Sequence, residues 1–113
     1  MSKITVTPAT GTWTVRSDDG VIVESKNALS LVEGDRPFVI YFPREDIAMA
    51  LFERTDTTTH CPYKGDAAYY SYVGQAGTIK DVAWTYEDVI NDDAKAVEGH
   101  MAFYAGKVTV EQI

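Results

Sequence analysis

The amino-acid sequence predicts a mainly β fold with two short helical pieces, and three observations support this prediction. Apolar residues recur with a period of two along most of the chain, as in half-buried strands. Short turn sequences rich in glycine and aspartate separate these runs. The chain has 113 residues, 45% of them hydrophobic, which suffices for one core of ordinary quality. We therefore expect a single domain over residues 1–113.

The first half of the chain predicts a hairpin, a third strand and a central strand. The run PFVIYF, residues 37–42, is an unbroken series of apolar, aromatic and β-branched residues, so we expect it to be the central strand, buried on both faces. Before it, the alternation around Trp13 and the turn at residues 18–20 predict a hairpin. The expected strands are residues 12–16, 21–23, 28–32 and 37–42.

The second half predicts the two helical pieces and six further strands. Pro43 lacks an N–H and ends the central strand, and the acids after it favour the first turn of a short helix at residues 44–49. One acidic helical turn is expected within residues 87–98. The remaining strands are expected at residues 51–54, 57–60, 67–73, 78–86, 101–104 and 108–110. Loop 74–77 would join a hairpin, and the last two strands would form a closing hairpin around Gly106.

The charge of the chain is negative and unevenly distributed. There are 17 acidic and 10 basic residues, a net charge of −7, and beyond Lys80 there are seven acidic residues and two basic ones. Nucleic acids and anionic membranes are bound largely through lysine and arginine. The sequence therefore argues against both as partners, although it leaves room for a local basic pocket that takes one small anion.

The start of the chain and its cysteine content indicate a soluble, cytoplasmic protein. The opening MSKITVTPAT lacks the apolar core and cleavage site of a secretory signal, and no stretch approaches the roughly 18 apolar residues of a membrane span. The single cysteine, Cys61, cannot form an internal disulfide, which suits a reducing compartment.

Two neighbouring stretches gather most of the residue types that carry chemistry. They are YFPRED, residues 41–46, and THCPYKGDAAYYSYV, residues 59–73. Together they hold the only cysteine, one of the two histidines and five of the seven tyrosines, with an arginine, a lysine and several carboxylates. A structural strand rarely needs such a mixture, so we expect the functional site here. The common phosphate-loop, dinucleotide-binding and hydrolase motifs are absent from the sequence.

Cys61 is the candidate nucleophile or redox group, and His60 directly precedes it. Adjacent residues on a strand point to opposite faces, so His60 is badly placed to act as its base. Free cysteine is also among the most buried residue types. An inert core thiol is therefore the simpler interpretation of Cys61.

Arg44 and Lys64 are the two cations of these stretches, each beside a chain reversal that contains proline. Arginine offers a planar fork to a carboxylate or phosphate, and lysine offers a mobile point charge. One hypothesis is that they hold a small anion together. The alternative is that both are solvated, or that Arg44 pairs with Asp46 or Asp66.

Aromatic side chains could form the walls of the same pocket. The candidates are Tyr63, Tyr70 and Trp84, because such side chains combine flat faces with polar tips. Tyr70 and Tyr72 share one face of their expected strand, and Tyr69 takes the other. Aromatic walls with two cations would suit a planar anionic ligand such as a nucleotide, although core packing is the default role of these residues.

Glu45 and Asp46 are adjacent carboxylates that could act as an acid–base pair or hold a magnesium ion. They fit equally well as charges at the N-terminus of a helix. One cysteine and two histidines, His60 and His100, do not make the usual four-ligand zinc site. We therefore expect no resident metal and no cofactor.

At these residues the chain resembles a family of small bacterial proteins catalogued as a domain of unknown function. The likeness covers about residues 20–110, and its CPYKG core is specific. The pattern consists of YFPREDI at residues 41–47, a leucine-containing strand at Leu51, T-x-CPYKG-x-A-x-Y at 59–69, WxYE at 84–87, and a glycine followed by AFY at 99–104.

The resemblance implies a metal-free relative of the Mss4-like, or β-tent, architecture, with two antiparallel sheets of hairpins that meet at an angle. Better-known members of that architecture bind zinc through paired cysteines or reduce methionine sulfoxide, and this chain lacks the cysteine pairs. The family is sometimes labelled nucleotidyltransferase-like. That activity would need an acidic metal-binding cluster, which only Glu45 and Asp46 resemble, and a phosphate-binding glycine element, which nothing in the sequence matches.

Three functions follow from these residues. The first is a domain that binds a small anionic or aromatic molecule through the YFPRED and CPYKG segments. The second is an enzyme that uses Cys61 as nucleophile or redox group, or Glu45 and Asp46 as acid and base. The third is a protein-interaction module whose acidic last third meets a basic partner. We favour the first.

Overall fold

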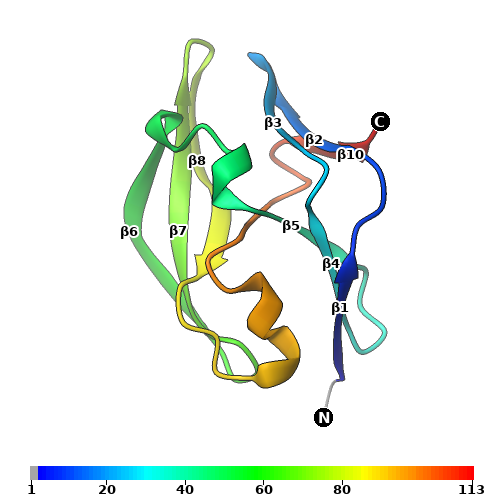
Figure 1. Ribbon diagram of the computed structural model, residues 1–113. Coiled ribbons are helices and arrows are strands. Elements are labelled where there is room, and N and C mark those ends of the chain that lie inside the picture. Colours follow the sequence, from blue (N-terminus) through cyan, green and yellow to red (C-terminus); the bar gives the residue numbers. More distant parts are fainter. Residues whose placement is uncertain (1–2) are drawn as a thin grey trace.

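The computed structural model of the chain, which describes residues 3–113, contains two antiparallel β-sheets and short 3₁₀ helices (Figure 1). This confirms the predicted mainly β class. The strands are β1 (Ile4–Pro8), β2 (Trp13–Ser17), β3 (Gly20–Ser25), β4 (Leu29–Glu33), β5 (Val39–Phe42), β6 (Phe52–Cys61), β7 (Gly65–Gly74), β8 (Gly77–Tyr86), β9 (Met101–Phe103) and β10 (Thr109–Gln112). The 3₁₀ helices are η1 (Arg44–Asp46), η2 (Met49–Leu51) and η3 (Asp92–Val97).

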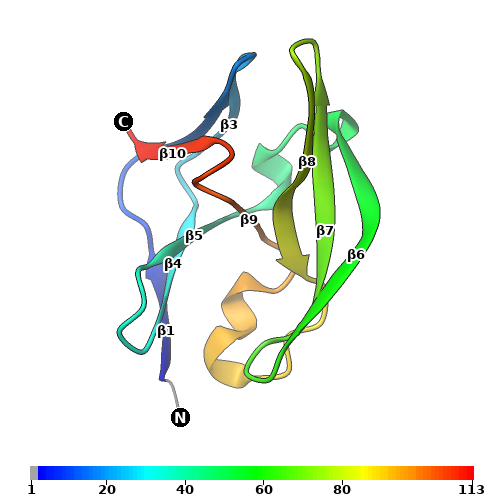
Figure 2. The same ribbon diagram turned by 180° about the vertical axis from the view of Figure 1, so that it is seen from behind.

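The large sheet has seven strands in the order β1-β4-β5-β9-β8-β7-β6, and the small sheet has three in the order β10-β2-β3. The large sheet is strongly bent, so that β6, β7 and β8 form one arm and β1 and β4 the other (Figures 1 and 2). η3 lies between the two arms at one end of the molecule. Within residues 3–113, no helix is long and apolar enough to cross a membrane.

The tips of two hairpins meet at the opposite end from η3. The carboxylate of Asp19, in the turn between β2 and β3, accepts a bond from the Tyr72 hydroxyl at 2.8 Å and one from the Ala76 N–H at 2.9 Å. These two bonds connect the small sheet to the β7–β8 hairpin. Both hairpins, including the loop at residues 74–77, were predicted from the sequence and are confirmed.

The strand register places one row of side chains across the middle of the large sheet. The opposite pairs are Leu29 with Tyr41, Tyr41 with Ala102, Ala102 with Trp84, and Trp84 with Tyr69. Directly opposite residues point to the same face of a sheet, so this row shares one face. Because Ala102 is small, the rings of Tyr41 and Trp84 meet edge to face over it, with centroids 6.4 Å apart.

The two faces of the large sheet carry separate hydrophobic cores. The inter-sheet core, between the large and small sheets, contains Val15 together with Tyr70 and Tyr72 of β7. The second core, on the other face, contains Tyr69 and packs against Val97 of η3. The predicted division of the tyrosines between two faces is therefore confirmed.

β5 is buried on both faces, as predicted, since Ile40, Tyr41 and Phe42 are at most 6% exposed. It is not the central strand, however. That position belongs to the three-residue strand β9, which is completely buried but too short to show a period of its own. Phe38, the second residue of the PFVIYF run, lies before β5 and is 56% exposed.

The predicted helix at residues 44–49 is instead two separate 3₁₀ turns, η1 and η2. Between them, Ile47 has extended backbone and forms a β-bridge with Val23, so that its side chain joins the inter-sheet core. The second predicted helical piece is confirmed as η3. The Asn91 side chain caps it by accepting a bond from the Asp93 N–H at 2.9 Å.

The strands predicted at residues 51–54 and 57–60 are one strand, β6, with a shift of register between Arg54 and Thr58. At this bulge the hydroxyls of Thr55 and Thr57 donate to the carboxylate of Asp81 in β8, at 2.6 and 2.7 Å. Asp81 has a positive φ of 50°, which aspartate tolerates better than most residues. The polar break in the sequence therefore marks a bulge rather than the end of a strand.

The predicted closing hairpin is wrong. β9 pairs with β5 and β8 in the large sheet, whereas β10 pairs with β2 in the small sheet. The chain therefore passes from one sheet to the other between these strands. β1 was not predicted, although its residues alternate in type, and it pairs with β4 at the edge of the large sheet. The finer likeness to the Mss4-like β-tent stays a prediction.

Candidate functional site

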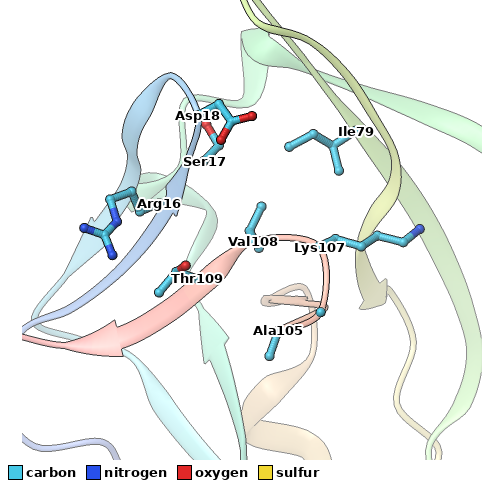
Figure 3. A pocket seen from close by; sticks show the side chains of 9 residues that line it. Arg16, Ser17, Asp18, Ile79, Ala105, Lys107, Val108 and Thr109 are labelled. Carbon is cyan, nitrogen blue, oxygen red and sulfur yellow. The ribbon is translucent and has the colours of Figure 1, made fainter.

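One cavity, of about 420 Å³, opens between the small sheet, β8 and the loop before β10 (Figure 3). The Arg16 guanidinium at its edge binds Glu111 at 3.1 Å, and the Lys107 ammonium donates to the Lys80 carbonyl at 2.7 Å. In Figure 3 these two cationic groups point to opposite sides. Because the two cationic groups diverge and do not meet at one point in the cavity, this cavity is the weaker candidate.

The stronger candidate is a cavity of about 250 Å³ on the face of the large sheet that carries Tyr41. We call it the aromatic cavity. Its aromatic walls are Tyr41, Tyr69, Trp84, Tyr86 and Tyr104, and its remaining lining residues are Leu31, Glu33, Arg36, Pro37, Val39 and Lys64. The cross-strand row through Tyr41 supplies three of these walls, so the strand register itself builds the cavity.

Hydrogen bonds and ring contacts hold the walls in place. The Trp84 Nε1–H donates to the Tyr41 hydroxyl at 3.3 Å. The Tyr69 hydroxyl shares hydrogen bonds with Thr59 at 3.0 Å and with Tyr104 at 3.3 Å. The rings of Trp84 and Tyr104 lie 4.5 Å apart. Walls that are fixed in advance reduce the entropy that a ligand loses by ordering them.

Lys64 and Glu33 form a buried ion pair in the lining of the aromatic cavity. The Lys64 Nζ donates to the Glu33 Oε1 at 2.6 Å, and the two side chains are 9% and 6% exposed. The same Nζ lies 5.7 Å from the centre of the Tyr86 ring. An ammonium group has three donors and the bond to Glu33 uses one of them, so Lys64 can also meet a polar group on a ligand.

The turn between β6 and β7 positions Lys64. Its N–H donates to the Cys61 carbonyl at 3.3 Å, and its carbonyl accepts a bond from the Ile90 N–H at 3.1 Å. The next residue, Gly65, has a φ of +117°, and a Cβ there would lie 2.9 Å from the Asp88 carbonyl oxygen. The glycine of CPYKG therefore allows this turn to dock on the segment after β8.

Burial raises the pKa of three phenols in the aromatic cavity. Desolvation raises the pKa of Tyr41 to about 12, although the hydrogen bond from Trp84 opposes the shift. Desolvation, helped by the hydrogen bond with Tyr69, raises the pKa of Tyr104 to about 12. The pKa of Tyr86 is raised still further, again mainly by burial. A phenol is already neutral at physiological pH, and burial extends this neutral range into alkali, so each of the three hydroxyls keeps a proton that it can donate.

Arg36 lies at the rim of the aromatic cavity, on the turn after β4, and is exposed. Its N–H donates to the Glu33 carbonyl at 3.1 Å, which fixes the backbone of the turn. The cavity lining contains two cations, Lys64 and Arg36, and one carboxylate, Glu33, so its formal charge is +1. This local surplus of positive charge contrasts with the net charge of −7 of the whole chain.

The structure does not bring Arg44 and Lys64 together. The Arg44 guanidinium donates to the Gly99 carbonyl at 2.8 Å and to Glu87 at 2.6 Å, and it lies 5.8 Å from the centre of the Tyr70 ring. Its ion-pair partner is thus Glu87 and neither of the aspartates considered from the sequence. Tyr70 belongs to the inter-sheet core, so the large sheet separates Arg44 from the aromatic cavity.

Cys61 is a half-buried free thiol that, like Tyr63, packs against the second core. His60 points to the other side, as strand alternation predicts. The His60 Nδ1 lies 2.8 Å from the Asp66 carboxylate, and both of these side chains are exposed. His60 is therefore engaged by Asp66 rather than by Cys61.

Glu45 and Asp46 both belong to η1, away from the aromatic cavity. Glu45 is exposed, whereas Asp46 accepts a bond from the Ser25 hydroxyl at 2.6 Å and so connects η1 to the end of β3. Among residues 3–113, no group of three or more histidine, cysteine, aspartate or glutamate side chains is arranged to hold a metal ion.

Sequence reasoning selected Lys64 and Trp84 but missed four charged or aromatic lining residues outside the two dense stretches, which are Glu33, Arg36, Tyr86 and Tyr104. A signal for Glu33 is present in the sequence, since it continues the inward alternation of Leu31 in β4. A carboxylate at an inward strand position indicates a buried partner. Arg36 has no comparable signal, because its turn approaches the cavity only in the folded chain.

Comparison with known proteins gives one family. A family model described as a domain of unknown function (DUF427) matches residues 5–113, which includes almost all of β1 and the whole of β10. No curated protein matches the chain significantly.

Proposed function

The chain belongs to the DUF427 family, and we propose that it binds a small planar molecule with one acidic group in the aromatic cavity. The observation that carries the proposal is the composition of the lining: five aromatic walls, a buried ion pair and an exposed arginine at the rim. Flat rings of a ligand pack against such walls, and a monoanion balances the formal charge of +1.

Each part of the lining has a role in this proposal. Arg36 offers its planar fork to a carboxylate or a similar acid, while the Lys64–Glu33 pair contributes dipoles and donors without net charge. The Tyr41 hydroxyl accepts from Trp84 and keeps its own proton, so it can donate to the ligand. The size of the cavity, about 250 Å³, suits a ligand with a single ring system.

A titration with benzoate, followed by amide and indole NMR signals, tests the proposal. Benzoate is expected to shift the signals of Trp84 Nε1–H and of the turn around Arg36. Benzamide, which has the same ring without the charge, is expected to bind roughly tenfold more weakly, because it loses a charge-assisted hydrogen bond.

Two charge-matched variants make the test specific. Arg36→Gln should reduce the affinity for benzoate to that for benzamide. Arg16→Gln removes the same charge at the other cavity, and should leave both affinities unchanged. If benzoate shifts none of the cavity signals, or if Arg36→Gln retains the full preference for the anion, the proposed binding mode is wrong.

A further inference from the structure

An apolar groove of about 380 Å³ lies beside the aromatic cavity, where the large and small sheets approach one another. We call it the apolar groove. Its lining residues are Trp13, Pro37, Phe38, Val39, Ile40, Trp84, Phe103, Tyr104, Ala105 and Val110. None of these residues is charged, in contrast to the lining of the aromatic cavity.

The apolar groove and the aromatic cavity adjoin one another. They share Pro37, Val39, Trp84 and Tyr104 as lining residues. The Trp84 and Tyr104 rings, 4.5 Å apart, therefore present surface to both spaces. A molecule bound against these two rings would lie at the border of both spaces.

The groove leaves apolar surface in contact with water. Phe38 is 56% exposed and meets Trp13 edge to face, with ring centroids 6.1 Å apart. Tyr104, at the junction, is 39% exposed. Covering such rings with hydrocarbon is favourable, because it removes their apolar surface from water.

We propose that the ligand is an amphipathic monoacid: its planar acidic head occupies the aromatic cavity, and a hydrocarbon tail lies in the apolar groove. This inference rests on the proposed function, which supplies the head. The division of charge supports it, because the cations line only the cavity and the groove lining is wholly uncharged. The shared Trp84 and Tyr104 would hold the point where head and tail join.

A series of 4-alkylbenzoates with tails from zero to six carbons tests this inference by calorimetry on the whole chain. Each methylene that enters the groove is expected to tighten binding roughly fourfold, until the groove is filled. Phe38→Ser should flatten this dependence on tail length while leaving the affinity for benzoate itself unchanged. Val21→Ser is the control, because Val21 is also 56% exposed but is not a lining residue of the groove.

The outcomes separate this inference from the proposed function. Benzoate binding without any gain from the tail would overturn the amphipathic ligand and leave the aromatic cavity as a binding site. Failure of every member of the series to bind would remove both proposals. If sedimentation instead shows self-association that Phe38→Ser abolishes, a second copy of the chain covers the groove, and the tail has no place there.

Discussion

The Lys64 ammonium donates to the Glu33 carboxylate at 2.6 Å between two nearly buried side chains, and joins the CPYKG turn to the end of β4. Removing two charges from water costs several kcal/mol each, and the mutual attraction of the pair offsets this cost only while both partners are present. The pair therefore makes the stability of the fold depend on two residues that lie far apart in the sequence.

Lys64→Met is expected to lower the free energy of unfolding by about 3–5 kcal/mol, because it leaves the Glu33 carboxylate buried without a partner. The double variant Glu33→Leu/Lys64→Met removes both charges and should recover most of this loss. Urea unfolding followed by far-UV circular dichroism measures both. Equal losses in the single and double variants would show that the ion pair contributes through packing alone.

Stability should fall in alkali through Tyr41. Its pKa in the folded chain is about 12 against 10.0 for an unperturbed phenol, so its contribution is fully present below pH 10 and is lost as the pH rises through 12. The shift corresponds to roughly 2–3 kcal/mol. Tyr41→Phe should therefore lose less stability than the parent chain between pH 10 and pH 12, as measured by urea unfolding. Equal losses in Tyr41→Phe and in the parent chain would contradict the raised pKa of Tyr41.

The guanidinium of Arg44 should matter for stability and not for binding. Arg44→Lys cannot contact both Gly99 and Glu87 with a fork, so we expect a loss of about 1–2 kcal/mol in urea unfolding. Arg16→Lys, at a more exposed ion pair, should change stability by less than about 0.5 kcal/mol. Benzoate affinity should be the same in Arg44→Lys as in the parent chain. A clear decrease in this affinity would show that Arg44 takes part in binding.

Asp81 should stabilise the bulge of β6 and lose this effect in acid. The hydroxyl bonds from Thr55 and Thr57 lower its pKa below the usual 3.8, so its contribution is present above pH 3.8 and is lost as the pH falls through the lower, folded value. Asp81→Ala is expected to cost about 1–3 kcal/mol at neutral pH. Asp81→Asn tolerates the positive φ, so it should cost less stability than Asp81→Ala and should remove this part of the acid dependence. Chemical denaturation of the parent chain and of both variants, at neutral and at acidic pH, measures these differences.

The sequence predicted those parts of the fold that depend on neighbouring residues. The β2–β3 and β7–β8 hairpins follow from alternation and glycine turns, and the burial of β5 follows from an unbroken apolar run. The extended backbone of Ile47, which interrupts the helix predicted at residues 44–49, could not be predicted in this way, because Ile47 forms a bridge with Val23, a residue distant in the chain. β9 and β10 belong to different sheets, and this too depends on contacts between segments that are distant in the chain.

The candidate site shows the same limit. Lys64 and Trp84 were recognisable by their residue type within unusual segments, and both line the aromatic cavity. Arg44 looked equivalent to Lys64, since the sequence cannot tell which face of a sheet each cation reaches. Glu33 and Arg36 depend on how β4 and its turn approach the CPYKG turn, and only the three-dimensional arrangement supplies that.

The separation of β9 from β10 has a consequence for how the chain acquires its structure. β10 pairs with β2, so Thr109 must come to lie opposite Arg16, a residue far from it in the sequence. Until that encounter, the small sheet consists of the β2–β3 hairpin alone, and an isolated hairpin is marginally stable in water. Such distant pairings slow folding, because the entropy of closing the loop is lost before the contacts form. During synthesis, one side of the apolar groove, at Val110, must therefore remain open until β10 has left the ribosome.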